Sequence, residues 1–303
     1  MTQQTNNQNE NQQVAKRGID RLKAALYAPS IQQQFENALR DHKDVFVASI
    51  IDLYNSDNGL QECDPTALIL EALKAATLKL PINKALGFAY IVKFNNSVKQ
   101  PDGTWLKVPT PTFIPGYKGY IQLAMRTGQY ETINADVVYE GETGKIDKLT
   151  GKIEFDGAKK SDKIVGYFAH FELLNGFKKT LYIELEDIAK FAKRYSPSIK
   201  GDKGVTVESL KKLAGKDPTG IGWTGNFDSM ALKTVLRNLL AKFGYLSVEM
   251  QNVIAKDIEA DAENERNRIV GAVDAVVIDP AELQGPGNSQ PPAPEQKKDT
   301  EPY

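Results

Sequence analysis

The residues of this chain that are best suited to chemistry lie in the segment 115–130, which reads PGYKGYIQLAMRTGQY. A helix is expected over most of it, and Lys118, Gln122 and Arg126 recur at four-residue intervals. On a helix of 3.6 residues per turn these three side chains form one stripe. No carboxylate stands at the neighbouring helical positions to neutralise the two cations. The stripe suits a polyanion followed along its length better than a small molecule; a solvated helix face is the alternative.

A second basic face is expected on a helix over residues 226–243. Its leucines and valines fall within one apolar sector, and Lys233 and Arg237 fall roughly opposite, together with Phe227. Trp223 precedes this helix in a glycine-rich stretch. It is either a core anchor or a platform on which a base could stack, and we favour the second reading slightly.

A third group of candidate binding residues lies at the C-terminal end of the helix expected around residues 186–195. It consists of Lys193, Arg194 and Tyr195. Cations at this position can equally complement the helix dipole. In a nucleic-acid site, Lys and Arg would neutralise phosphates, and aromatic rings would stack on bases at about 1–3 kcal/mol per base.

Catalytic motifs are missing from the sequence. None of its three Gly-Lys pairs is followed by Ser or Thr, so there is no phosphate-binding loop of the ATPase type. A zinc site or a Ser/His/Asp triad is not credible, because the chain has only two histidines and one cysteine, Cys63. Asp136, Glu140 and Glu142 could hold magnesium for a nuclease, although carboxylates near turns usually face solvent. We therefore expect no catalytic residues, no metal and no cofactor.

The net charge of −1 hides an uneven distribution. Residues 74–245 carry 27 Lys and Arg against 17 Asp and Glu, whereas the segments 1–73 and 246–303 are both acidic. A basic middle between acidic ends would attract a polyanion, but it supports nucleic-acid binding only weakly by itself. No apolar run is long enough to span a bilayer, and the polar N-terminus resembles no signal peptide, so we expect a cytoplasmic protein without a membrane partner.

The order of predicted elements favours an α+β fold. Helical periodicity predicts an N-terminal helical region over 14–62, after a Gln/Asn-rich, disordered segment 1–13. Residues 63–248 read as a core in which a long hairpin and further antiparallel strands pack with several helices. The acidic, Pro/Gly-rich remainder, 249–303, is expected to be a mostly disordered, flexible tail, with an apolar island at 269–278 that is either a weakly packed helix or a docking site for a partner.

An apolar stripe on the first helix is a candidate for contacts between subunits. Ile19, Leu22 and Leu26 follow one another at helical spacing before Pro29. Such a stripe can fold back on its own core or dock on a neighbouring subunit, and we favour the neighbour.

Four blocks of the chain resemble the RecT family of phage single-strand DNA annealing proteins. They are PINKALGFAY at 81–90, the GYKG helix above, AKRYS at 192–196, and WTGNFDSMALKTVLRNLLAKFG at 223–244. The resemblance covers roughly residues 15–250. It implies recombination by binding single-stranded DNA and pairing it with its complement, without ATP or other nucleotide hydrolysis, and it matches all the basic and aromatic candidates above.

The same resemblance suggests an oligomeric ring or helical filament. Its partners would be single-stranded DNA, the annealed duplex intermediate, other copies of the chain and, through the tail, a single-strand binding protein or a phage exonuclease of the bacterial host cell. Two rival functions remain open: a magnesium-dependent DNA-processing enzyme, and a single-strand binding protein that does not anneal. An annealing protein must leave the base-pairing edges accessible, so most of its contacts should grip phosphates.

Overall fold

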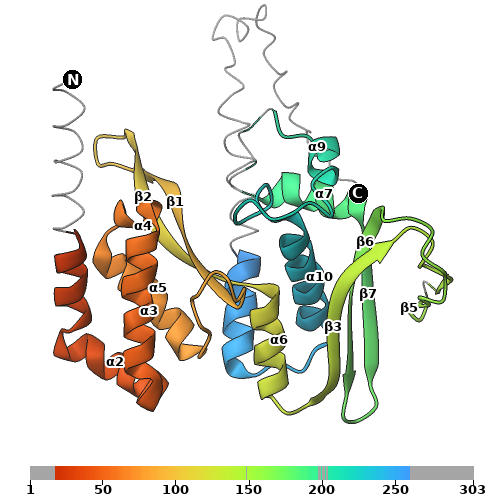
Figure 1. The fold of residues 1–303 in the computed structure, drawn as a ribbon, viewed down its shortest axis with the longest axis horizontal. Coiled ribbons are helices and arrows are strands. Elements are labelled where there is room, and N and C mark those ends of the chain that lie inside the picture. The colour runs from red at the N-terminus through yellow and green to blue at the C-terminus, as the bar shows by residue number, and fades with distance from the viewer. Residues whose placement is uncertain (1–17, 148, 197–198, 200–201, 203, 260–303) are drawn as a thin grey trace, which may run out of the picture.

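Figure 1 shows the fold in a computed structural model, which describes residues 18–259 apart from 148, 197–198, 200–201 and 203. A helical N-terminal unit and a larger α+β unit lie side by side, and a long β-hairpin lies between them. The α+β fold class and its antiparallel pairing are confirmed. The predicted disordered segment 1–13 and the docking segment 269–278 lie outside the described residues.

The N-terminal unit is built from short helices. After the helical residues 18–26 come α2 (Pro29–Leu39), the 3-10 helix η1 (Arg40–His42), α3 (Lys43–Ser56), α4 (Asn58–Gln61) and α5 (Pro65–Thr77). Pro29 opens α2 as its first helical residue, where a missing N–H costs nothing. Asp64 caps α5 by accepting a hydrogen bond from the Ala67 amide at 3.0 Å.

Leu22 and Leu26 are completely buried in the core of this N-terminal unit, and Ile19 packs against the same core. The apolar stripe on the first helix therefore folds back on its own chain, which is the alternative that we did not favour. The stripe packs on the apolar surface that α2, α3 and α5 provide within the same chain. In this conformation the two leucines are not accessible to a neighbouring subunit.

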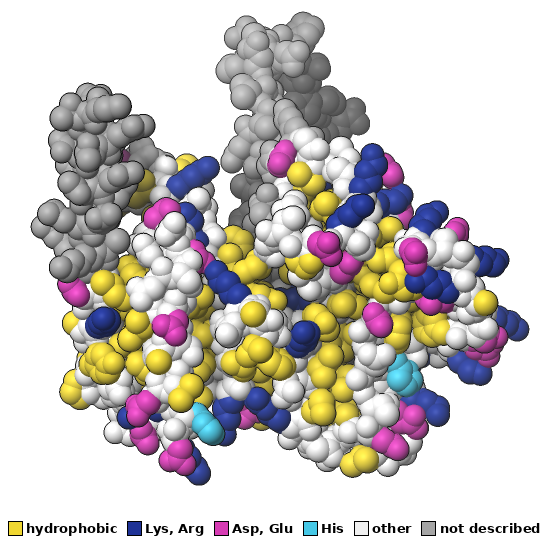
Figure 2. Space-filling model, viewed as in Figure 1, with side chains coloured by type: hydrophobic (Ala, Val, Ile, Leu, Met, Phe, Trp, Pro, Cys, Tyr) yellow, Lys and Arg dark blue, Asp and Glu magenta, His cyan; other side chains and the backbone are white. Residues whose placement is uncertain are grey.

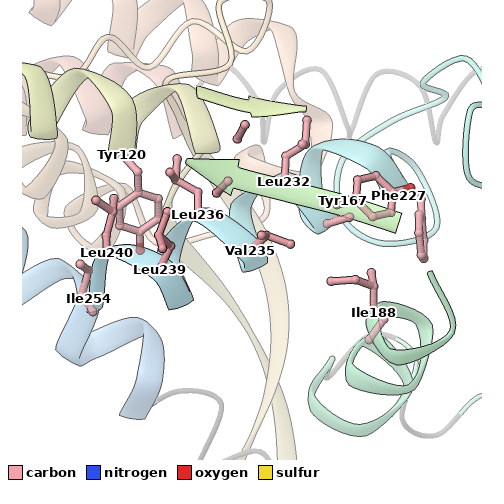
Figure 3. Packing of buried hydrophobic residues seen from close by; sticks show 14 of the residues in the cluster. Tyr120, Tyr167, Ile188, Phe227, Leu232, Val235, Leu236, Leu239, Leu240 and Ile254 are labelled. Carbon is pink, nitrogen blue, oxygen red and sulfur yellow. The ribbon is translucent and has the colours of Figure 1, made fainter. Parts of the chain in front are cut away.

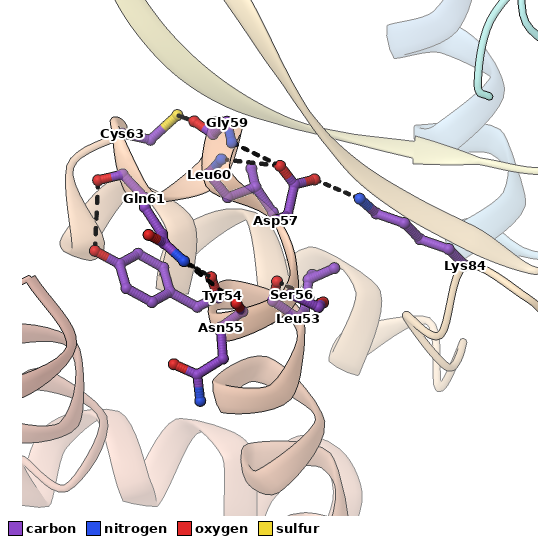
Figure 4. Close-up of polar contacts among 10 residues, drawn as sticks. All are labelled: Leu53, Tyr54, Asn55, Ser56, Asp57, Gly59, Leu60, Gln61, Cys63 and Lys84. Atoms are coloured by element: carbon purple, nitrogen blue, oxygen red, sulfur yellow. Dashed lines mark hydrogen bonds and ion pairs between the residues drawn. The ribbon is translucent and has the colours of Figure 1, made fainter. Parts of the chain in front are cut away.

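A polar network ties the N-terminal unit to the loop that follows α5 (Figure 4). The Asp57 side chain accepts hydrogen bonds from the amides of Gly59 and Leu60, and it also forms an ion pair with Lys84. Cys63, beside this network, is buried, and burial raises the pKa of its thiol to about 11. The thiol therefore stays protonated near neutral pH, which makes it unreactive.

The hairpin joins β1 (Ala89–Lys99) and β2 (Trp105–Pro115), paired in continuous antiparallel register. It is the long hairpin expected from the sequence. Gly103 supplies the positive φ of 86° that its turn requires. Near the base of the hairpin, Ile91 lies in the core of the N-terminal unit and Ala89 in that of the larger unit. The hairpin base therefore packs against both units.

The larger unit surrounds a three-stranded antiparallel sheet of order β3-β6-β7. Its elements are α6 (Tyr117–Arg126), β3 (Tyr130–Tyr139), β4 (Ile146–Asp147), β5 (Lys152–Ile153), β6 (Ile164–Leu173), β7 (Lys178–Glu184), α7 (Leu185–Tyr195), α9 (Val207–Lys211) and α10 (Phe227–Phe243). β4 and β5 pair as a short antiparallel hairpin. The helix α10 runs through the centre, and most of its residues are buried.

The core does not end at residue 248. Residues 248–259 form a further helical segment, in which Met250 and Ile254 are buried. Figure 3 shows Ile254 beside Leu240 of α10 and Tyr120 of α6. This segment therefore belongs with the core, not with the acidic tail in which the sequence analysis placed it.

Candidate nucleic-acid interface

The two glycines of the GYKG motif let α6 begin directly against the preceding loop. The amide of Gly116 donates a hydrogen bond to the Phe88 carbonyl at 2.9 Å. A Cβ at Gly119 would lie 2.2 Å from that same carbonyl oxygen, so no other residue fits there without backbone movement. The blocks 81–90 and 115–130 are thus in direct contact, and the contact sets where the stripe on α6 lies.

The stripe itself is on the outside of α6. Lys118 is exposed, and within the described residues it has no carboxylate partner; Gln122 is half-buried. Arg126 is also exposed, but its guanidinium donates to the carbonyls of Leu78 at 2.6 Å and Lys79 at 2.9 Å. Arg126 therefore joins α6 to the end of α5 and keeps its remaining N–H donors for other partners.

The second basic face is not on the surface. The Lys233 and Arg237 side chains are only 10% and 7% exposed, because the helical segment 248–259 covers them. A carboxylate oxygen of Asp257 lies 2.8 Å from Lys233 Nζ and 3.9 Å from Arg237 Nη1. The hydroxyl of Tyr120 donates to the same oxygen at 2.7 Å.

Burial tends to raise the pKa of Asp257, but Lys233, the Tyr120 hydroxyl and Arg237 outweigh it and hold that pKa below its ordinary value. The carboxylate is therefore charged at neutral pH and neutralises a cation inside the fold. Lys233 and Arg237 stabilise the junction of α6, α10 and the segment 248–259. Direct DNA contact by these two residues is not available in this conformation.

Trp223 and Phe227 are core residues. They are 5% and 3% exposed, and their rings lie 5.4 Å apart at a steep angle. Phe191 of α7 continues the cluster at 6.3 Å from Trp223. Trp223 is accordingly a core anchor, the alternative that the sequence left open, and no base could stack on it here.

The end of α7 is partly exposed. Tyr195 is half-buried and stacks on Phe191 at 4.6 Å, and the Arg194 guanidinium lies 5.3 Å from the centre of the Tyr195 ring. Lys193 donates to the carbonyl of Asp202 at 2.9 Å. Of the third group, Arg194 is exposed and Tyr195 is half-buried, so both have surface that a DNA strand could reach.

Sequence reasoning missed two features. Trp105 and Lys107, both exposed, point to the same face of the hairpin beside its turn, and residue alternation could have indicated this. Asp228, in the fourth block, accepts hydrogen bonds from the Tyr167 hydroxyl at 2.5 Å and from the Gly215 amide at 2.9 Å. No pattern in the sequence indicates these contacts of Asp228, because Tyr167 and Gly215 are distant from it along the chain.

The comparison with protein families matches the RecT family over residues 44–270. The chain belongs to the RecT family. An uncharacterised protein of Bacillus subtilis, YqaK, is 39% identical over 93% of this chain and 86% of its own length. The protein named RecT of Escherichia coli is 26% identical over 76% of this chain and 77% of its own. RecT membership links the chain to DNA binding, single-strand annealing and recombination, as the four blocks predict.

The structure gives these RecT blocks a common location. Blocks 81–90 and 115–130 meet at Gly116, and the other two meet where Phe191, next to the 192–196 block, packs on Trp223. Tyr120 connects the two pairs through its bond to Asp257, which also neutralises Lys233. The blocks therefore build one shared core, and only some of their cations reach the surface.

Proposed function

We propose that this protein binds single-stranded DNA along the exposed stripe of α6 and anneals it to a complementary strand without hydrolysing nucleotide. The observation that carries the proposal is Lys118, an exposed cation without a carboxylate partner among the described residues, on the surface of the GYKG helix. Gln122 and Arg126 extend the same stripe, and Arg194 with Tyr195 supplies a second accessible cation beside an aromatic ring. Family membership supports annealing as the outcome.

The experiment compares Lys118→Ala with the folded wild-type protein in binding to single-stranded oligonucleotides of several sequences. We expect affinity to fall similarly for all of them, and the slope of log affinity against log salt to become less steep by about 0.7. Lys178→Ala is the control, because this lysine of β7 is 65% exposed but already has a carboxylate partner, Glu172, at 3.6 Å. Unchanged binding by Lys118→Ala would return the stripe to a solvated helix face.

We further propose that several copies assemble on the strand as a ring or filament, in phage recombination within the bacterial cytoplasm. Because Leu22 and Leu26 are buried, the N-terminal unit would use its exposed side chains for this contact, such as Tyr27, which is 61% exposed. Across the described helices, none combines the length and apolarity that crossing a bilayer requires. The segment 269–278 remains our candidate for recruiting a single-strand binding protein or an exonuclease.

No specific observation favours the rival enzyme. Asp136 and Glu142 accept hydrogen bonds from the amides of Val137 and Tyr139, and Glu140 accepts one from Ser161. Within the described part of the chain, no three His, Cys, Asp or Glu residues are grouped as a metal site would need. A protein that coats single strands without annealing them would leave the rate of duplex formation between complementary oligonucleotides unchanged.

A further inference from the structure

A basic hollow of about 390 Å³ lies where α2 and α5 end, outside the stripe described above. Arg40 and Lys79 line both this hollow and a second one beside it. His42, Val45 and Ser49 complete one wall. Figure 2 shows Lys and Arg side chains gathered beside a histidine at the lower edge of the molecule, between the N-terminal helices and α6.

The backbone at both cations is unusual. Arg40, with φ of 50°, and Lys79, with φ of 51°, are the two residues other than glycine that have positive φ in the described chain. At Lys79 the helix closes with hydrogen bonds from the Lys79 amide to Ala76 and from the Leu80 amide to Ala75, a pattern whose left-handed residue is normally glycine. Residues other than glycine whose backbone is held at positive φ are often found at functional positions.

The charges of the hollow are not balanced by neighbours. Within the described residues neither Arg40 nor Lys79 has a carboxylate partner, and Asp41 is the one carboxylate among the lining residues. Both cations do complement the dipoles of α2 and α5. A Lys or Arg in the last helical turn would do so without positive φ, so the dipoles alone do not account for these positions.

The hollow continues the stripe on α6. Arg126 donates to the carbonyls of Leu78 and Lys79, so the last cation of the stripe touches the backbone that carries Lys79. From Lys118 to Arg126 the stripe covers about 12 Å, at 1.5 Å per residue. Lys118, Arg126, Lys79 and Arg40 therefore follow one another from α6 onto the N-terminal unit.

We propose that this hollow is a phosphate-binding site that carries the DNA backbone from α6 onto the N-terminal unit. The positive charges of Arg40 and Lys79 would together neutralise one phosphate group, and the apolar side of Val45 would face the sugar. The proposal rests on the proposed function, because it extends the same strand. It predicts that each copy contacts more of the strand than the stripe on α6 alone could reach.

The test uses the full chain with Arg40→Gly and Lys79→Gly combined. Glycine suits positive φ, so the thermal unfolding midpoint should stay the same or rise, whereas binding should weaken. Loss of this one phosphate contact should make the salt slope less steep by about 0.7 and lower the affinity about fivefold near 0.1 M salt. Lys178→Ala is again the control, and Arg40→Lys with Lys79→Arg should keep the affinity within about twofold of wild type.

The outcomes separate this proposal from the proposed function. If Lys118→Ala weakens binding and the double glycine variant binds like wild type, the hollow is not a DNA site, although the function stands. If wild-type protein binds no single-stranded DNA, both proposals fail. If the glycine variant instead loses DNA-free assemblies at unchanged affinity, the hollow is a contact between copies. If the charge-conserving variant loses affinity as much as the glycine variant while both stay folded, phosphate recognition by charge is contradicted.

Discussion

One carboxylate, Asp257, determines the role of two cations that lie in the RecT blocks. Asp257 lies between Lys233 and Arg237 and also accepts the hydroxyl of Tyr120, so three elements meet at a single side chain. A buried ion pair is weak evidence for stability, but removing one partner is strongly destabilising, since it leaves a charge without compensation. The role of these cations is therefore structural in the described conformation.

Asp257→Asn should lower the free energy of unfolding at pH 7 by about 3 kcal/mol, because Lys233 would remain buried without its counter-charge. The folded pKa of Asp257 lies below the ordinary value of 3.8, so its contribution is complete above about pH 4 and is lost as the pH falls through the folded pKa. Denaturant unfolding of both proteins at pH 7 and near pH 3 measures this. A difference that is the same at both pH values, or absent at pH 7, would contradict the charge-compensating role.

Residue types and spacing predicted the stripe on α6 correctly as exposed at Lys118 and Arg126, because one helix determines which side chains share a face. The same reasoning failed for Lys233 and Arg237. Their position opposite the leucines of α10 was read correctly, but the segment that covers them begins after the helix has ended. Its Asp257 is 20 residues beyond Arg237, and no local pattern reveals that contact.

At the scale of elements, residue alternation predicted the long hairpin, because that signal is local. Its strand β2 includes Pro109, Pro111 and Pro115, which a strand with a free edge can accommodate. The boundary near residue 248 was misplaced. The acidic composition after 248 suggested a tail, whereas Met250, Val253 and Ile254 pack one face of this helical segment on the core.

A chain that ends at residue 247 should be severely destabilised. It loses the burial of Met250 and Ile254, at roughly 1.5–3 kcal/mol each, and the carboxylate that compensates Lys233. A chain that ends at residue 270, where the family match ends, keeps Met250, Ile254 and the carboxylate of Asp257. Thermal unfolding and annealing of purified oligonucleotides should therefore be preserved in the longer chain and lost in the shorter one.

The opposite result is equally informative. If the chain ending at 247 unfolds at the same temperature as the full protein, the segment 248–259 is not part of the cooperative core. If the chain ending at 270 no longer anneals purified oligonucleotides, residues beyond it contribute to annealing itself and are not reserved for recruiting partners.

At the scale of the whole molecule, two units lie side by side with a hairpin between them, and exposed cations lead from α6 toward the N-terminal unit. Phosphate contacts by such side chains grip a strand without reading its sequence, so the base edges stay available for pairing. Composition predicted the basic middle region but could not place it, because the path of the cations depends on how α5 and α6 pack. The order of the four blocks along the chain was sufficient to predict the family.

The measurement that tests the account most directly is the rate at which two complementary oligonucleotides form a duplex, with and without purified full-length protein, and without nucleotide. We predict faster duplex formation with intact strands, and a smaller acceleration by Lys118→Ala than by the Lys178→Ala control. An unchanged rate despite tight binding would identify a protein that only coats single strands. Shortened oligonucleotides in the presence of magnesium would identify a DNA-processing enzyme, and either result would contradict annealing as the function of this chain.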